Sequence, residues 1–301
     1  LDRLIAKIEQ MNNPTVAGLD GKLEFIPGFI KEEAFSEYGK TPEGAAQALL
    51  RFNIGLIDAL YDIVPAVKPQ CAYYELLGWR GMKTLAQTIE YAKTKGLFVI
   101  TDGKRNDIGS TMEAYAAAHL GEITIEDTVV APFDGDALTV NGYLGSDGID
   151  PLLSICEKQD KGIFVLVKTS NPSSGELQDK KIDGKTVYEI MAEHCEHWGS
   201  GQIGKYGYSC VGAVVGATYP EQLSELRKKA PHTFFLVPGY GAQGAGAADI
   251  KGAFDTKGRG AIVNSSRAIM CAYKKGYDEK DYARAARDEA VRMKDEINGV
   301  L

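Results

Sequence analysis

Short apolar runs alternate with longer amphipathic stretches along most of this chain. Many of the runs are apolar at every position, which is typical of parallel strands buried on both faces. Seven strands are expected at residues 15–19, 66–67, 97–101, 162–168, 211–215, 234–237 and 261–263. A further strand, fourth in chain order, is expected at either 128–131 or 138–140. The pattern therefore predicts eight strands.

The stretches between these strands have the spacing and end signals of helices. Pro42 suits the first turn of a helix that continues to Leu60, and Gly96 ends another that begins near Gly81. A helix is also expected near residues 111–119. Leu4, Ile8 and Met11 share one face of an opening helix, and the final helix buries Ala286, Ala290, Met293 and Ile297.

Strands that alternate with helices indicate an α/β fold with a parallel sheet. The number of strands and the length of 301 residues favour a single domain over residues 1–301, a closed (β/α)8 TIM barrel with extra terminal helices. An open doubly wound sheet is the alternative. Two connections, 171–185 and 240–249, are long enough to form lids.

The charge balance restricts the classes of partner. Lys and Arg number 34 against 41 Asp and Glu, a net charge of −7, which argues against a nucleic-acid coat or a polybasic membrane binder. No apolar run is long enough to span a bilayer and no secretory segment opens the chain. The five cysteines are scattered, with no C-x-x-C pair. We expect a cytoplasmic protein with reduced cysteines and no nucleic-acid or membrane partner.

Polar residues gather at the predicted carboxyl ends of the strands, where barrels of this class hold their active sites. These ends are Asp20, Lys68, Asp102, Asn141, Thr169, Pro238 and Asn264. The densest cluster runs from Asp102 through Lys104 to Asp107, and alternation along an extended segment turns Asp102 and Lys104 to one side. Such an array can position a proton and oppose a negative substrate group. The alternative is a solvated turn with incidental ion pairs. The position of the cluster directly after an apolar strand favours an active site.

A second cluster suits phosphate. The glycine-rich segment 238–244 follows the seventh strand, and Ser265, Ser266 and Arg267 follow the eighth. The connections after these two strands often bind phosphate in this fold through backbone N–H groups and a helix N-terminus. Arg267 adds a planar cation that can hold two phosphate oxygens.

Taken in order, these motifs resemble the orotidine 5′-phosphate decarboxylase family, particularly its longer bacterial form. The signature Asp-x-Lys-x-x-Asp-Ile stands at residues 102–108, with Thr111 after it. Further matches are 19–20, 67–68, 168–172, 238–239, 241–244 and 264–267, so the resemblance spans nearly the whole chain. Gln70 departs from the Asn that some members carry two residues after the lysine.

The resemblance implies a carboxy-lyase that converts orotidine 5′-monophosphate to uridine 5′-monophosphate and CO2 in de novo pyrimidine biosynthesis. Lys104 would stabilise and protonate the C6 carbanion, and Asp102 would lie against the substrate carboxylate. Lys68 would link Asp102 to the ribose. The resemblance also implies a homodimer in which Asp107 and Thr111 enter the partner's site, and a reaction that needs no cofactor and no metal.

The same resemblance implies the contacts to the rest of the substrate. Asp20 would bind a ribose hydroxyl. Thr169 and Ser170 would meet the pyrimidine edge with Pro238 nearby. The residues expected around the 5′-phosphate are Gln243, Ser266 and Arg267.

Two other functions compete with this interpretation. A related barrel decarboxylase or aldolase would act on a sugar phosphate with magnesium, and a phosphate-ligand sensor would bind without turnover. A metal held by His194, Cys195 and His197 is disfavoured, because adjacent residues do not share a helix face.

Overall fold

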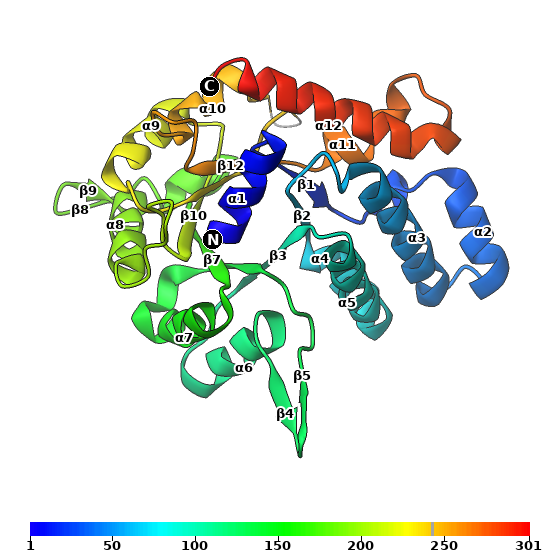
Figure 1. Cartoon of the computed structure of the whole chain (residues 1–301), viewed down its shortest axis with the longest axis horizontal. Helices are drawn as coiled ribbons and strands as arrows, with labels where there is room; N and C mark the ends of the chain where they lie inside the picture. Colours follow the sequence, from blue (N-terminus) through cyan, green and yellow to red (C-terminus); the bar gives the residue numbers. More distant parts are fainter. Residues whose placement is uncertain (242–243) are drawn as a thin grey trace.

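A closed barrel of parallel strands forms the centre of the molecule (Figure 1). The computed structural model describes residues 1–241 and 244–301. Within these residues, eight strands close the barrel in the order β1, β12, β11, β10, β7, β6, β3, β2. Their bounds are β1 Thr15–Leu19, β2 Ala66–Pro69, β3 Phe98–Arg105, β6 Ala137–Val140, β7 Gly162–Lys168, β10 Val211–Val215, β11 Phe235–Val237 and β12 Ala261–Ser265. The predicted TIM barrel is confirmed, and the open sheet is wrong.

The fourth barrel strand in chain order is β6, so the second of the two predicted segments is the correct one. Residues Thr128–Val130 instead form β5, which pairs antiparallel with β4, Ile123–Ile125, in a hairpin that projects from the barrel (Figure 1). Every residue of this hairpin's strands is exposed, whereas β6 is buried throughout. The β-branched residues of β5 favour extended backbone in a hairpin as well as in a barrel. Strand propensity alone therefore does not distinguish the two segments.

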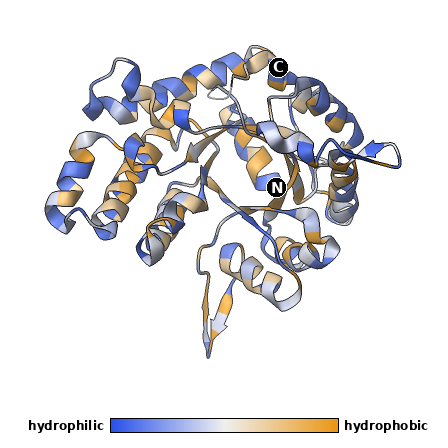
Figure 2. Cartoon of the chain, turned by 180° about the vertical axis from the view of Figure 1, so that it is seen from behind, coloured by the Kyte–Doolittle hydropathy of each residue, from blue (hydrophilic) through white to orange (hydrophobic). Residues whose placement is uncertain are grey.

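Helices cover the outside of the barrel, and Figure 2 shows hydrophobic residues along part of each helix surface and hydrophilic residues elsewhere. They are α1 Asp2–Met11, α2 Gly28–Tyr38, α3 Pro42–Leu60, α4 Cys71–Glu75, α5 Gly78–Thr94, α6 Gly109–His119, α7 Asp150–Gln159, α8 Val187–Gly199, α9 Pro220–Lys229, α10 Ala247–Ile250, α11 Arg267–Met270 and α12 Tyr282–Asn298. Short elements are η1 Leu23–Phe25, η2 Gly142–Leu144, η3 Ser146–Gly148, η4 Pro172–Glu176, β8 Lys181–Ile182, β9 Lys185–Thr186, η5 Lys251–Ala253, η6 Ala272–Lys275 and η7 Glu279–Asp281.

The helix boundaries follow the predicted end signals. α3 starts with Pro42 in its first turn, and the Thr41 hydroxyl accepts a hydrogen bond from the Gly44 N–H at 3.1 Å. α1 precedes the first strand and α12 ends the chain, as expected of the extra terminal helices. None of the described helices combines the length and the apolar character that crossing a membrane requires.

The barrel interior is filled by one apolar cluster. Its members on the strands are Val16, Ala66, Phe98, Ile100, Ala137, Phe164, Val214, Leu236 and Ile262, and Phe234 joins them from just before β11. Leu4 and Ile5 of α1 belong to the same cluster, so α1 closes one end of the barrel. The alternate residues, such as Ala17, Val67 and Val99, pack outward against the helices. Burial on both faces explains why the strands are apolar at nearly every position.

The same alternation brings polar residues to the barrel axis at the carboxyl ends of the strands. The residues that stand two positions after a member of the interior cluster include Lys68, Asp102, Thr139, Pro238 and Asn264. Because side chains in a strand alternate with a period of two, these residues turn toward the interior just beyond the apolar filling. The fold therefore concentrates polar chemistry at this end of the barrel.

Candidate active site

Two pockets open at the carboxyl end of the barrel and share Lys68, Asp102 and Pro238. The Lys104 pocket has a volume of about 450 Å³, and its other lining residues are Lys104, Thr139, Leu166, Thr169, Ser170, Asn171, Gln178, Val214 and Leu236. The Arg267 pocket has a volume of about 410 Å³, and its other lining residues are Asp20, Lys22, Phe25, Gln70, Tyr73, Gly239, Tyr240, Asn264, Ser266 and Arg267. Since the pockets meet at Lys68 and Asp102, an elongated ligand can span both.

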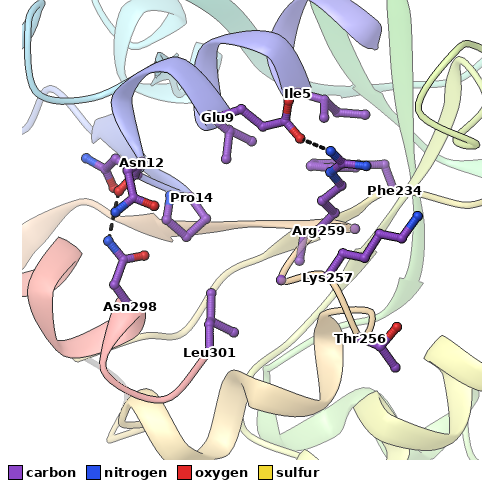
Figure 3. Close-up of a pocket in the computed structure, with 15 residues that line it drawn as sticks. Ile5, Glu9, Asn12, Pro14, Phe234, Thr256, Lys257, Arg259, Asn298 and Leu301 are labelled. Carbon is purple, nitrogen blue, oxygen red and sulfur yellow. Dashed lines mark hydrogen bonds and ion pairs between the residues drawn. The ribbon is translucent and has the colours of Figure 1, made fainter.

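A further pocket, of about 470 Å³, lies at the amino end of the barrel strands (Figure 3). Glu9 and Arg259 form an ion pair there, and the Asn298 side-chain amide donates to the Asn12 carbonyl at 2.8 Å. The hydrogen bond connects the ends of α1 and α12, and the ion pair joins α1 to the segment just before β12. In barrels of this class the amino end serves stability and the carboxyl end carries catalysis, so we place the candidate site at the carboxyl end.

Asp102 is the centre of the site and is 6% exposed. Its Oδ1 accepts hydrogen bonds from Lys104 Nζ at 2.6 Å and from Thr139 Oγ1 at 2.8 Å. Its Oδ2 accepts from Lys68 Nζ at 2.7 Å and from Gln70 Nε2 at 3.0 Å. Within this chain Gln70 therefore contacts the carboxylate at the centre of the site.

The two lysines keep Asp102 ionised despite its burial. Burial by itself raises the pKa of the Asp102 carboxyl, but attraction to Lys68 and Lys104 outweighs it and holds that pKa well below its usual range. Burial likewise lowers the pKa of the Lys68 ammonium, yet attraction to Asp102 and Asp20 raises it above its ordinary value. The site therefore carries a buried carboxylate held by two cations at neutral pH.

Lys104 reaches Asp102 through a bulge in β3. Thr101 of β3 pairs with Leu138 of β6, and Arg105 pairs with Val140, so the register shifts across the intervening residues. Lys104 has a φ of 49°, in the left-handed region that costs energy for a residue with a Cβ. The two side chains meet as the sequence predicts, but through this bulge rather than a regular extended strand. The Lys104 side chain is 45% exposed and so reaches the pocket.

Asp20 and Asn264 supply acceptors to the Arg267 pocket. Asp20 Oδ1 and Asn264 Oδ1 are buried without a hydrogen-bond partner among the described residues. Buried acceptors of this kind are costly, and both residues line the pocket that a ligand would fill. Gly18 permits this packing, because a Cβ there would lie 1.9 Å from the Ser266 hydroxyl oxygen.

Two of the residues expected around a phosphate line the same pocket. Ser266 and Arg267 line it from the end of β12 and the start of α11, and Gly239 lines it after β11. The Ser266 hydroxyl accepts a hydrogen bond from the Asn264 amide at 3.3 Å. Gln243, the remaining predicted phosphate ligand, lies outside the described residues.

Thr169 and Ser170, for which the resemblance implies contact with the pyrimidine edge, line the Lys104 pocket. The side-chain amide of Gln178 holds Thr169 in place: its Oε1 accepts from the Thr169 N–H at 2.9 Å and its Nε2 donates to the Thr169 hydroxyl at 2.7 Å. Asn171 accepts a hydrogen bond from the Thr169 hydroxyl at 2.6 Å. The predicted lid segment 171–185 therefore contributes to the pocket wall.

Asp107 and Thr111 lie outside both pockets of their own chain, as far as the described residues show. Asp107 accepts a hydrogen bond from the neighbouring Ile108 N–H at 2.9 Å, and Ile108 itself occupies the N-cap position of α6. Asp107 is therefore not the N-cap of this helix, and Thr111 is exposed in the first turn.

His194, Cys195 and His197 do not assemble a site. Cys195 is fully buried, whereas His194 and His197 are exposed on α8. His194 stacks on Trp198 with ring centroids 5.3 Å apart. Across the described parts of the chain, no three His, Cys, Asp or Glu side chains come together in an arrangement that could hold a metal ion.

Among the residues that hydrogen-bond to Asp102 or Thr169, sequence reasoning missed Thr139 and Gln178. A signal for Thr139 existed, because it stands near the end of a barrel strand and faces inward, but two segments competed for that strand. Gln178 lies in a long connection, where no periodicity indicates which side chain turns toward the pocket.

Comparisons with known proteins place the chain beside one family. The model of the orotidine 5′-phosphate decarboxylase / HUMPS family matches residues 50–282. The orotidine 5′-phosphate decarboxylase of Rhodopirellula baltica is 46% identical, covering 99% of this chain and 98% of the relative. That of Caldicellulosiruptor bescii is 42% identical, covering 100% and 98%. The structure of Leishmania donovani OMP decarboxylase covers 97% of each chain with a TM-score of 0.72 and 28% identity.

Proposed function

The chain belongs to the orotidine 5′-phosphate decarboxylase / HUMPS family, and from this premise we propose that it decarboxylates orotidine 5′-monophosphate. The products are uridine 5′-monophosphate and CO2, and the reaction serves de novo pyrimidine biosynthesis in the cytoplasm. One observation carries the proposal within the family: Asp102 holds Lys104 at 2.6 Å and Lys68 at 2.7 Å where the two pockets meet.

Lys104 performs the chemical step in this proposal. The C6–carboxylate bond breaks, CO2 leaves, and the electron pair of that bond remains on C6 in the plane of the ring. The Lys104 ammonium stabilises this charge and transfers a proton to C6, after which the neutral amine regains a proton from solvent. Its 45% side-chain exposure permits that exchange. This route uses no electron sink beyond the residues of the site, so no cofactor and no metal is required.

Asp102 and Lys68 prepare Lys104 for this role. Asp102 lies against the substrate carboxylate and fixes the ammonium before the reaction starts, so little reorganisation is needed as charge develops. Lys68 balances the charge of Asp102 and extends toward the ribose. Since both groups are buried, their attraction is weakly screened by water.

The rest of the nucleotide follows the line of the two pockets. The pyrimidine edge meets Thr169 and Ser170 in the Lys104 pocket, with Pro238 beside the ring. The ribose hydroxyls donate to the Asp20 carboxylate. The phosphate lies in the Arg267 pocket, and its proposed ligands are Gln243, Ser266 and Arg267. Binding energy from this remote group supports the geometry at the reacting carbon.

The proposal includes a homodimer with shared sites. Asp107 and Thr111 lie outside their own chain's pockets, and the nearby Ile108 side chain is 50% exposed. In a two-fold dimer each contact occurs twice with the partners reversed. Asp107 and Thr111 of each chain then complete the site of the other.

Loss of the orotate-ring absorbance on incubation with orotidine 5′-monophosphate tests the function. We expect full activity in excess chelator. Activity lost in chelator and restored by magnesium would favour the metal-dependent relative that acts on sugar phosphates. Binding of the nucleotide without turnover would favour a sensor.

A further inference from the structure

Thr139 connects the two ends of the bulge that carries the lysine and the carboxylate. Its side chain comes from β6 and is 1% exposed. The hydroxyl donates to Asp102 Oδ1 at 2.8 Å and accepts from the Lys104 backbone N–H at 3.0 Å. One hydroxyl group therefore contacts both members of the Asp102–Lys104 pair.

The register explains why a hydroxyl is suited to this position. Between the pairs Thr101–Leu138 and Arg105–Val140, three residues of β3 face Thr139 alone on β6. A regular ladder cannot continue there, so the Lys104 N–H needs a partner other than a strand carbonyl. The Thr139 side chain supplies that partner. It thus supports Lys104 in its left-handed conformation, with φ at 49°.

All the hydrogen-bond acceptor positions of the Asp102 carboxylate are occupied. Asp102 accepts four hydrogen bonds, two at each oxygen, which matches the roughly four lone-pair directions of a carboxylate. Thr139 and Lys104 share Oδ1, so the hydroxyl sets the orientation in which Oδ1 faces the ammonium. Removing it frees one acceptor direction and leaves the Lys104 N–H without its partner.

We propose that Thr139 is a positioning residue for the decarboxylation: its hydroxyl aligns Lys104 and Asp102 through the bulge without itself binding substrate. This inference rests on the proposed function, because its effect is read in the turnover of orotidine 5′-monophosphate. It goes beyond that function by assigning a role in catalysis to a residue that acts only through Lys104 and Asp102.

The test compares Thr139→Val, which has nearly the same shape, with Thr139→Ser, which keeps the hydroxyl. We expect Thr139→Val to lower kcat by about 10-fold to 100-fold, as for loss of a hydrogen bond to a charged group. KM and the Kd for uridine 5′-monophosphate should stay within about two-fold, because Thr139 is only 1% exposed and its hydroxyl is engaged by Asp102 and the Lys104 N–H. Thr139→Ser should restore kcat to within about three-fold of wild type, since both hydrogen bonds can form.

Thr101→Val is the matched control. Thr101 is also a buried threonine of the barrel, but its hydroxyl has no hydrogen-bond partner among the described residues. This substitution should leave kcat near the wild-type value. If Thr139→Val does not fold, Thr139→Ala measured against Thr139→Ser isolates the hydroxyl equally well, and thermal unfolding shows whether each variant is folded.

The outcomes separate the two proposals. The positioning role is overturned if Thr139→Val has the kcat of wild type, whether or not its KM and Kd rise. It is also overturned if Thr139→Ser is as slow as Thr139→Val. Those results leave the proposed function intact, since wild-type turnover is measured in parallel. Absence of turnover by the wild type overturns the proposed function and the role of Thr139 with it.

Discussion

Replacing Asp102 by Asn tests the electrostatic core of the site through both stability and activity. The substitution keeps the size of the side chain but removes the charge that lies between Lys68 and Lys104. The Lys68 side chain is only 5% exposed, and its ammonium lies 2.7 Å from the carboxylate it would lose. Lys104 is 45% exposed and can turn to solvent, so the stability cost falls mainly on Lys68.

Removing one partner of a buried ion pair costs about 3–5 kcal/mol, because the other charge stays buried without compensation. We expect Asp102→Asn to lower the free energy of unfolding by about that amount at neutral pH. Decarboxylation should fall to near background, because Lys104 loses the group that fixes its ammonium. A comparable loss of charge on the surface should be nearly neutral.

The difference in stability between wild type and Asp102→Asn should depend on pH. The pKa of Asp102 in the folded protein lies below its unfolded value of about 3.9, so its contribution is present above that pH and is lost as the pH falls toward the folded pKa. The pKa of Lys68 in the folded protein lies above its unfolded value of about 10.4, so its contribution is lost as the pH rises through the folded pKa. The difference should therefore be largest between about pH 5 and pH 9.

Urea unfolding over this pH range measures the effect. Asp62→Asn serves as the matched control, because Asp62 pairs with Arg287 on the surface at 2.6 Å, with both side chains more than a third exposed. That change should cost less than about 1 kcal/mol. An Asp102→Asn protein as stable as wild type at pH 7, or a difference that grows as the pH falls below 4, would refute the reasoning.

Three further predictions follow from the site. Lys104→Ala should nearly abolish decarboxylation, because it removes both the charge stabiliser and the proton source, while thermal unfolding shows an intact fold. A Lys104→Ala variant that turns over at the wild-type rate would contradict this. Arg267→Ala should raise KM and the Kd for uridine 5′-monophosphate more than it lowers kcat, and unchanged values of both would exclude Arg267 as a phosphate ligand. Mixing Lys104→Ala with Asp107→Ala chains should restore about one working site per heterodimer; verified heterodimers without recovery would show that Asp107 serves its own chain.

The barrel could be predicted from sequence because burial on both faces leaves a strong trace in each strand. Gly162–Lys168 and Val211–Val215 have the bounds that their apolar runs predict. The sequence did not identify the fourth barrel strand. Thr128–Val130 has the β-branched composition of a strand and does form one, but in an exposed hairpin outside the barrel. Local propensity does not indicate which sheet a strand joins.

The site was predictable where it follows strand ends and unpredictable where it depends on distant packing. Asp102 and Lys104 are neighbours in sequence, so their contact could be expected, but the bulge at Lys104 could not. Thr139 enters the site because β6 lies beside β3, and it was missed because two segments competed for the fourth strand. Gln178 reaches Thr169 from a long connection, where many side-chain directions are open.

The most direct test of the account is the reaction of orotidine 5′-monophosphate in D2O, followed by NMR of the product. The account predicts that the wild-type protein forms uridine 5′-monophosphate carrying one deuterium at C6 for each CO2 released, in the presence of excess chelator. It also predicts that Lys104→Ala forms almost none. Substrate that persists unchanged with the wild-type protein, or product formed by Lys104→Ala at the wild-type rate, would contradict the assignment of Lys104 as the proton donor in a decarboxylase.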